Sequence, residues 1–176
     1  SEYLDTGARV YTSLDGMLAA EKPEAVVITT PDYLHCEHSL ACLRANAHVL
    51  VDKPLATTVA DCRGIIEAAE AARRIVMVGF NLRCHPVLKR LKEIIDSGML
   101  GKLFLIENRE FYNGGRTYMS RWNRLREKSG GLWIHKGSHD FDVFNWLLDF
   151  PRPLRVTATA GNNVFTPDKL PFPVKH

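Results

Sequence analysis

The stretch Ala25-Val26-Val27-Ile28-Thr29-Thr30 decides the fold, because a continuous apolar, β-branched run predicts a strand buried on both faces. A helical pattern follows at residues 34–46, and a second short strand is expected at 48–51. Residues 61–73 are Ala-rich and helical, and a third buried strand is expected at 75–80. Strands that alternate with crossover helices predict a parallel, doubly wound α/β sheet.

The regions on either side of this core extend the pattern. Before it, we expect a short strand at residues 8–11 and a helix at 13–20. The elements expected after Phe80 are a helix from Pro86 to Gly98, a strand at 103–111, a polar loop at 112–130, a helix at 131–148 and a strand at 154–160. The partial alternation at 103–111 indicates a second sheet, mostly antiparallel, with one wetter face.

Composition narrows the class of protein. The chain has 176 residues, of which 45% are hydrophobic and 24% charged, as in a globular protein with a substantial core. A net charge of +3, spread among both signs, does not suggest a nucleic-acid partner. No apolar stretch approaches the roughly 20 residues of a membrane helix. The four cysteines lack zinc-like spacing, so we expect reduced thiols and a cytoplasmic location.

The first candidate site is the end of the strand at 25–30, where Thr30 and Pro31 precede His35. Ligands of open parallel sheets bind at the carboxyl ends of strands, beside helix N-termini. Thr30 and Pro31 are therefore candidates to line a crevice that His35 reaches. The alternative interpretation is a helix cap followed by an ordinary surface histidine.

The second candidate site is the turn Asp52-Lys53-Pro54, at the end of the next strand. Proline breaks the strand and makes a tight turn, and the X-Pro bond is a candidate for the cis isomer. A lysine on this turn could hydrogen-bond a substrate hydroxyl and stabilise a developing alkoxide. The alternative is a solvated surface lysine, which is the commoner fate of this residue.

The third candidate site lies on the helix expected at 131–148. On a continuous helix, His135, His139, Asp142 and Trp146 fall within an arc of roughly 60°. Histidine is the side chain best suited to proton transfer near neutral pH. Two alternatives remain: an exposed polar face, and a zinc site at His135 and His139, which the absence of H-E-x-x-H disfavours.

Taken together and in this order, the motifs resemble the Gfo/Idh/MocA oxidoreductase family. The matching residues are Thr30-Pro31 with His35, Asp52-Lys53-Pro54, Val78-Gly79-Phe80-Asn81 with Arg83 and Pro86, Ile95-Asp96-Ser97-Gly98 with Gly101-Lys102, and Gly130-Gly131 before His135, His139 and Asp142. The resemblance implies that residues 1–83 are the C-terminal part of a Rossmann domain that binds NAD or NADP. It implies that residues 84–176 begin a substrate-binding and oligomerisation α/β domain, in a homo-oligomer acting on a sugar or polyol.

The resemblance also assigns roles to individual residues. The residues that it assigns to the cofactor are Thr30, Pro31, His35, Asp52, Lys53, Asn81 and Arg83. Lys53 is similar to the family's catalytic lysine, and His139 to the histidine that takes the hydroxyl proton. His135 stands where the common family pattern has Asp, which makes it a third catalytic candidate of open role, with Asp142 nearby to contact substrate.

The loop at 112–130 supplies further substrate candidates, namely Tyr118, Arg121, Trp122 and Arg124. Aromatic faces stack on sugar C–H surfaces and arginines meet hydroxyls or carboxylates, although a solvated surface loop is an equal alternative. The sequence contains no G-x-G-x-x-G, so we expect an internal fragment that binds cofactor weakly by itself. The competing functions are an NAD-dependent glycosidase with a retained cofactor and a non-catalytic fragment.

Overall fold

The computed structural model describes residues 7–162, 166 and 169. These fall into two compact units, unit 1 at residues 1–79 and unit 2 at 80–176. The division lies four residues before the boundary at 83 expected from the sequence.

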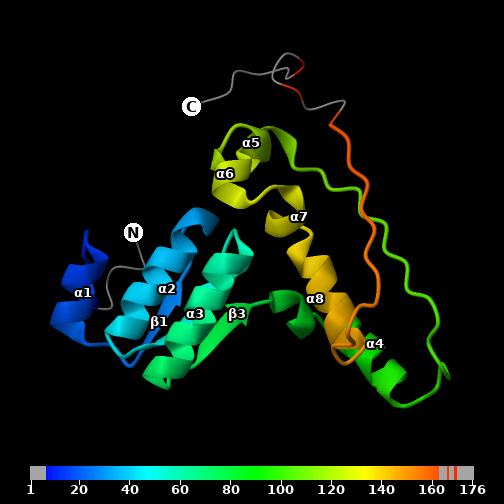
Figure 1. The fold of residues 1–176 in the computed structure, drawn as a ribbon, viewed down its shortest axis with the longest axis horizontal. Coiled ribbons are helices and arrows are strands. Elements are labelled where there is room, and N and C mark those ends of the chain that lie inside the picture. Colours follow the sequence, from blue (N-terminus) through cyan, green and yellow to red (C-terminus); the bar gives the residue numbers. More distant parts are fainter. Residues whose placement is uncertain (1–6, 163–165, 167–168, 170–176) are drawn as a thin grey trace. The chain divides into compact units, whose positions relative to one another are not determined.

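Unit 1 is built on a parallel sheet of three strands, β1 (Ala25–Ile28), β2 (His48–Asp52) and β3 (Val76–Gly79). The order is β1-β2-β3, with Ala25 opposite His48 and Asp52 opposite Gly79. The predicted parallel α/β sheet is therefore confirmed, and β1 lies at an edge of the described sheet (Figure 1).

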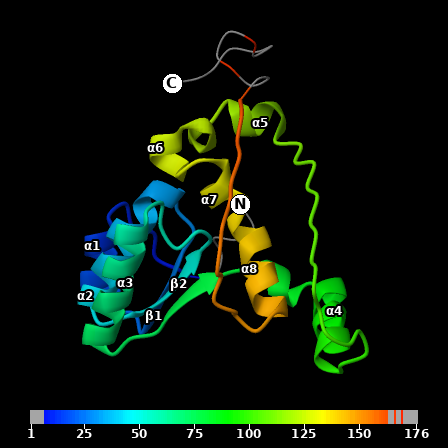
Figure 2. The ribbon, with the colours of Figure 1, turned by 45° about the vertical axis from the view of Figure 1, so that its right-hand side comes forward.

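Three helices cover one face of this sheet, α1 (Leu14–Glu21), α2 (His35–Arg44) and α3 (Val59–Ala72) (Figures 1 and 2). Side-chain caps fix two of the helix starts. Ser13 Oγ accepts from the Gly16 N–H at 3.3 Å, and Thr58 Oγ1 accepts from the Asp61 N–H at 3.1 Å. These bonds satisfy amide groups that the first helical turn leaves without partners.

The core of unit 1 lies between the helices and the sheet. Its buried members are Leu18, Ile28, Cys42, Leu43, Ala47, Val49, Val51, Ala56, Ile65 and Ala69. On the opposite face, Val27, Leu50 and Met77 form one row across the three strands and are 64%, 37% and 62% exposed. The prediction that the strand at 25–30 is buried on both faces is thus wrong for the described chain, because α1, α2 and α3 all lie on one side.

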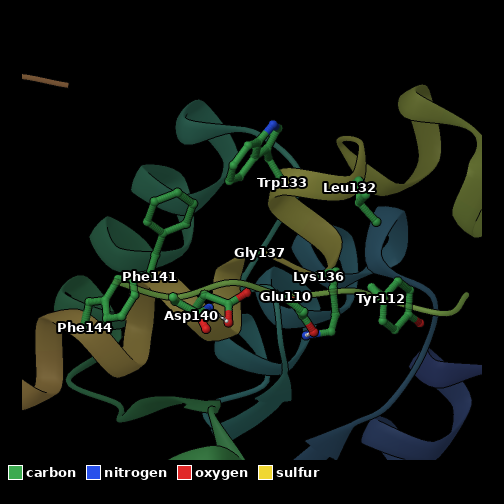
Figure 3. Close-up of a pocket in the computed structure, with 10 residues that line it drawn as sticks. Glu110, Tyr112, Leu132, Trp133, Lys136, Gly137, Asp140, Phe141 and Phe144 are labelled. Carbon is green, nitrogen blue, oxygen red and sulfur yellow. Dashed lines mark hydrogen bonds and ion pairs between the residues drawn. The ribbon is translucent and has the colours of Figure 1, made fainter. Parts of the chain in front are cut away.

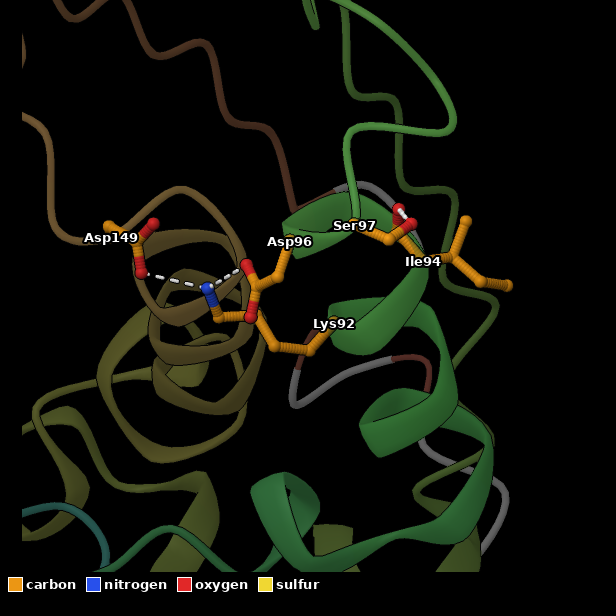
Figure 4. Close-up of polar contacts among 5 residues, drawn as sticks. All are labelled: Lys92, Ile94, Asp96, Ser97 and Asp149. Atoms are coloured by element: carbon orange, nitrogen blue, oxygen red, sulfur yellow. Dashed lines mark hydrogen bonds and ion pairs between the residues drawn. The ribbon is translucent and has the colours of Figure 1, made fainter.

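The regular elements in the described part of unit 2 are all helical. After the short 3-10 helix η2 (Asn81–Cys84), its helices are α4 (Pro86–Asp96), α5 (Gly115–Met119), α6 (Arg126–Ser129), α7 (Leu132–His135) and α8 (Ser138–Leu147), with a 3-10 turn η3 (Trp122–Arg124) between α5 and α6. Lys92 of α4 bonds Asp96 at 2.6 Å and Asp149, just after α8, at 2.7 Å (Figure 4). This ion pair ties α4 to the end of α8. In residues 7–162, no helix has both the length and the apolar character needed to span a bilayer.

Several predicted elements differ from the structure. The segments 8–11, 103–111 and 154–160 were expected to be strands, but in the described residues they pair with no neighbour. An alternating pattern becomes a strand only where a partner completes its ladder of hydrogen bonds. The region 112–130, expected as a loop, contains α5, η3 and α6.

The helix expected at 131–148 is interrupted between α7 and α8. A Cβ at Gly137 would lie 2.8 Å from the carbonyl oxygen of Trp133, a distance that no ordinary side chain tolerates. The Gly137 N–H bonds the Leu132 carbonyl at 3.1 Å, one residue beyond the regular α-helical partner. The predicted single arc of four residues is therefore wrong, and His135 belongs to a different helix from His139 and Asp142.

Candidate functional site

Five residues predicted to form the site lie in unit 1, at the carboxyl ends of β1 and β2. Thr30 and Pro31 follow β1, and His35 begins α2. Asp52 is the last residue of β2, and Lys53 follows it directly. Parallel strands bring these ends to one edge of the sheet, which is where ligands of such sheets bind.

His35 is buried, with 1% of its surface exposed. Its ring lies between two carbonyl groups, with Nδ1 2.7 Å from the Pro54 oxygen and Nε2 2.8 Å from the Thr30 oxygen. The sequence suggested a histidine that reaches into a crevice, whereas the structure has both ring nitrogens bonded to the protein backbone. The neighbouring His38 Nδ1 lies 3.1 Å from Thr30 Oγ1.

The turn that carries Lys53 is held by local contacts. The Lys53–Pro54 peptide bond is cis. The Lys53 N–H donates to Asp52 Oδ1 at 2.8 Å, and Pro54 is buried. A Cβ at Gly79 would lie 3.4 Å from the Val51 carbonyl oxygen, so glycine lets β3 approach the end of β2 closely. The Lys53 side chain is therefore presented from a backbone fixed on both sides.

In unit 2, His139 lies on α8 beside a second cluster. The Phe80 ring packs edge-on against the His139 ring, with centroids 6.3 Å apart. Arg83 donates from Nε to Asp142 Oδ2 at 2.8 Å and from a terminal nitrogen to Asp142 Oδ1. Its guanidinium also lies over the rings of Phe80 and Phe150, 5.9 and 5.2 Å from their centroids.

This cluster changes how two predicted site residues are understood. The hydrogen bonds that Arg83 donates to the Asp142 carboxylate raise the pKa of Arg83, and the Asp142 side chain is only 6% exposed. The two residues bind each other as a bidentate pair, and this pair links η2 to α8. Contacts of Arg83 and Asn81 with cofactor, and of Asp142 with substrate, stay predictions.

His135, on α7, is surrounded by residues of the predicted substrate loop. The Tyr118 and Trp122 rings each lie 5.5 Å from the His135 ring, and Asn123 Nδ2 is 3.2 Å from His135 Nε2. Since an amide NH2 can only donate, this contact requires Nε2 to accept and thus to carry no proton. Asn123 was missed by the sequence reasoning, because one Asn in a polar loop gives no signal.

The other two predicted loop residues stand apart from this group. Arg121 is exposed, and Arg124 is half-buried with its Nε enclosed and without a hydrogen-bond partner among the described residues. Neither residue makes a contact that tests its predicted role. Within the described ranges, no group of three or more His, Cys, Asp or Glu side chains is arranged to hold a metal ion.

A pocket of about 390 Å³ is lined by residues of α7 and α8, by Lys136 and Gly137 between them, and by residues of the segment 108–112 (Figure 3). Lys136 Nζ lies 2.5 Å from Glu110 Oε1, and Asn108 donates to Asp140 at 2.9 Å. Trp133, Phe141 and Phe144 supply aromatic parts of the lining. Nothing in the sequence singles out this pocket, because its polar members come from segments that only the fold brings together.

The pKa values of the two carboxyl groups of this pocket, Glu110 and Asp140, shift in opposite directions. The hydrogen bond from Lys136 lowers the pKa of Glu110. Burial raises the pKa of Asp140, and repulsion by the Glu110 carboxylate adds to that rise. Asp140 therefore carries the less favourable charge of the pair at neutral pH.

Comparison with known proteins identifies the two units. Residues 3–80 match the oxidoreductase family with an NAD-binding Rossmann fold, and residues 92–169 match the C-terminal alpha/beta domain of the same family. The chain belongs to the Gfo/Idh/MocA oxidoreductase family. The predicted family and fold class are confirmed, and the predicted nicotinamide cofactor is confirmed as the ligand of an NAD-binding Rossmann domain.

Similar proteins include an inositol 2-dehydrogenase of Saccharopolyspora erythraea, 34% identical over 88% of this chain and 42% of its own. A 2,7-anhydro-N-acetylneuraminate hydratase of Mediterraneibacter gnavus is 31% identical over 87% of this chain and 40% of its own. Among solved structures, the WlbA dehydrogenase of Bordetella pertussis, in complex with NADH and UDP-GlcNAcA, matches with a TM-score of 0.66. It is 28% identical, and the match covers 84% of this chain and 43% of that protein. The chain thus spans well under half the length of each of these proteins.

The carboxyl ends of β1 and β2 carry side chains that are chemically suited to part of a nicotinamide cofactor. It carries the Thr30 hydroxyl, the Asp52 carboxylate and the Lys53 ammonium on backbone fixed by His35 and Gly79. Hydroxyl, carboxylate and ammonium groups complement the ribose hydroxyls and the carboxamide of a nicotinamide nucleotide. The contacts of Thr30, Asp52 and Lys53 with NAD stay predictions, as do those of Pro31 and His35.

Proposed function

We propose that the full-length protein transfers hydride between a nicotinamide cofactor and a hydroxyl-bearing carbon of a sugar or cyclic polyol. Membership of an NAD-binding oxidoreductase family supports the redox chemistry. Inositol 2-dehydrogenases, 34% and 32% identical to this chain, support the substrate class. Because the chain spans 42% and 46% of those relatives, the proposal concerns the whole protein.

The observation that carries the substrate class is the cluster around His135. Tyr118 and Trp122 bring aromatic rings to within 5.5 Å of the imidazole ring, and Asn123 adds an amide. Aromatic faces complement the C–H surface of a sugar or cyclitol, and amide and imidazole groups exchange hydrogen bonds with its hydroxyls. A cluster that combines the two fits a compact polyhydroxylated ring better than an aliphatic alcohol.

We assign two roles in the oxidation direction. Lys53 donates a hydrogen bond to the reacting oxygen and stabilises the negative charge that develops there. His139 takes the proton of the substrate hydroxyl as general base. Bound NAD would supply the hydride acceptor, and the substrate would lose a C–H hydride to it and the O–H proton to His139 as the carbonyl forms. Phe80, against the His139 ring, limits the orientations open to this imidazole.

The test is to incubate full-length protein with NAD or NADP and a panel of free cyclitols and aldoses, following reduced cofactor by absorbance. We expect turnover with at least one cyclic polyol or sugar, and little with short-chain alcohols. Turnover confined to aliphatic alcohols would reject the proposed substrate class.

A second candidate is a reaction in which a retained cofactor oxidises and then re-reduces the sugar, as in an NAD-dependent glycosidase. The observation in its favour is the 31% identical relative named as a hydratase, a reaction without net oxidation. Product formation from a glycoside or anhydrosugar without net release of reduced cofactor would favour this candidate over the dehydrogenase.

A further inference from the structure

His35 is placed between two loops of unit 1 rather than at its surface. The ring bonds the Thr30 carbonyl, just after β1, and the Pro54 carbonyl, just after β2. With 1% of the residue exposed, water has almost no access to either ring nitrogen. The imidazole therefore has to satisfy both carbonyl groups itself.

Counting donors determines what form of the ring does this. A carbonyl oxygen accepts hydrogen bonds and never donates them, while a neutral imidazole has one N–H and one bare nitrogen. In a neutral His35, the bare nitrogen would face a carbonyl lone pair at 2.7 or 2.8 Å, with no proton between them. Both separations lie in the range typical of charge-assisted N–H···O bonds. Only the imidazolium, with two N–H groups, satisfies both carbonyls.

The charges carried by the surrounding elements fit a positive ring in part. Asp32, His35 and Cys42 are the buried ionisable side chains in the described part of unit 1, and Asp32, three residues before His35, is the carboxyl group among them. The N-terminal position on α2 opposes a positive ring, because the helix dipole is positive there. The other titratable side chains within three residues of His35 are Tyr33, Cys36, Glu37 and His38. Those at the neighbouring element ends are Asp52, which ends β2, Lys53, which follows it, and Asp61 and Cys62 in the first turn of α3.

We propose that His35 is a doubly protonated clamp that joins the ends of β1 and β2 and thereby positions Lys53. The clamp holds the carbonyl of Pro54, the residue directly after the lysine, while Asp52 holds the Lys53 N–H from the other side. His35 is thus a positioning residue that acts through Lys53. Its effect on turnover rests on the proposed function of Lys53, whereas its protonation state does not.

Side-chain 15N NMR of the full-length protein tests the protonation state directly. We expect both His35 ring nitrogens to carry a proton at pH 7. His48 provides the reference, since its Nδ1 accepts the Ile75 N–H at 3.0 Å and must be bare. A single protonated nitrogen on His35 at pH 7 would overturn the clamp, whatever the enzyme assays give.

Kinetics test whether the clamp acts through Lys53. We expect His35→Gln to lower kcat about 10- to 100-fold, the scale of a misplaced catalytic group. His48→Gln, at the opposite end of β2, should leave kcat within about twofold of the parent, because it moves no group placed in the site. In a Lys53→Ala background, His35→Gln should cause no further loss, since the group it positions is gone.

Two outcomes separate the two proposals. An equal further loss from His35→Gln in the Lys53→Ala background would show that His35 acts independently, and would overturn its positioning role. Near-normal turnover of Lys53→Ala alone would instead reject the proposed function of the lysine and with it the kinetic part of this inference. The NMR result would still decide whether the clamp exists.

Discussion

The pair formed by Arg83 and Asp142 gives the sharpest stability prediction. Asp142→Asn keeps the size of the side chain but removes its charge and turns an NH2 group toward the guanidinium. The change leaves Arg83 facing a donor where it had a carboxylate oxygen, in a place where Asp142 is 6% exposed. We expect unit 2 to lose stability while unit 1 is unaffected.

The magnitude follows from the burial of the two partners. Removing one member of a fully buried ion pair costs about 3–5 kcal/mol. The Arg83 side chain is 35% exposed, so water solvates part of the unpaired guanidinium, and the contacts with Phe80 and Phe150 remain. We therefore expect a loss of about 2 kcal/mol, the worth of one hydrogen bond between charged groups.

Urea unfolding followed by tryptophan fluorescence is the suitable assay, because all three tryptophans, Trp122, Trp133 and Trp146, belong to unit 2. The matched control is Glu93→Gln, which removes a partner of Arg90 at 2.8 Å with both side chains more than 60% exposed. That pair should contribute about 0.3 kcal/mol. If Asp142→Asn destabilises unit 2 no more than Glu93→Gln does, the reasoning from burial is refuted.

Two further predictions concern α7 and α8. Because the folded pKa of Asp140 is raised by burial and by Glu110, its charge disfavours the folded state above that pKa, and this penalty disappears as the pH falls through it. Asp140→Asn should therefore increase the free energy of unfolding of unit 2 at pH 7 by about 0.5 kcal/mol, the scale of a partly exposed charge pair, and by much less at pH 3. An equal gain at both pH values in urea unfolding would contradict this. Gly137→Ala should destabilise unit 2 by about 1–3 kcal/mol, since the new Cβ meets the Trp133 carbonyl at 2.8 Å. The matched control is Gly64→Ala, in the middle of α3 with open space around it, which should stabilise unit 1 by about 0.5–1 kcal/mol. A stabilising Gly137→Ala would show that the break between α7 and α8 does not require glycine.

Much of unit 1 could be predicted from the sequence because its signals are local. Apolar β-branched runs place β1, β2 and β3 to within two residues at each end, and alternation with helices gives the parallel order. The two-sided burial of the strand at 25–30 was wrong, since a run such as Val26-Val27-Ile28 has no feature that says which face is covered. That information lies in the placement of α1, α2 and α3.

The sequence predicted which residues lie near the candidate site better than it predicted their hydrogen-bond partners. Sequence spacing put His35 and Lys53 at strand ends, but a backbone carbonyl leaves no trace in a sequence, so the bond from His35 to Pro54 was invisible. The pairing of Arg83 with Asp142 joins residues 59 positions apart. Periodicity also cannot show that Gly137 interrupts a helix, because an isolated glycine inside a helical pattern is often tolerated.

The most direct test of the central claim is the effect of Lys53→Ala on the full-length protein, measured as kcat with a saturating polyol substrate and as Kd for NAD. Losing one hydrogen-bond donor to a developing oxyanion lowers kcat by about 10²- to 10³-fold. We expect that loss with Kd for NAD changed by less than about tenfold, and no loss for Lys89→Ala on the exposed surface of α4. A kcat for Lys53→Ala close to that of the parent protein would contradict the account.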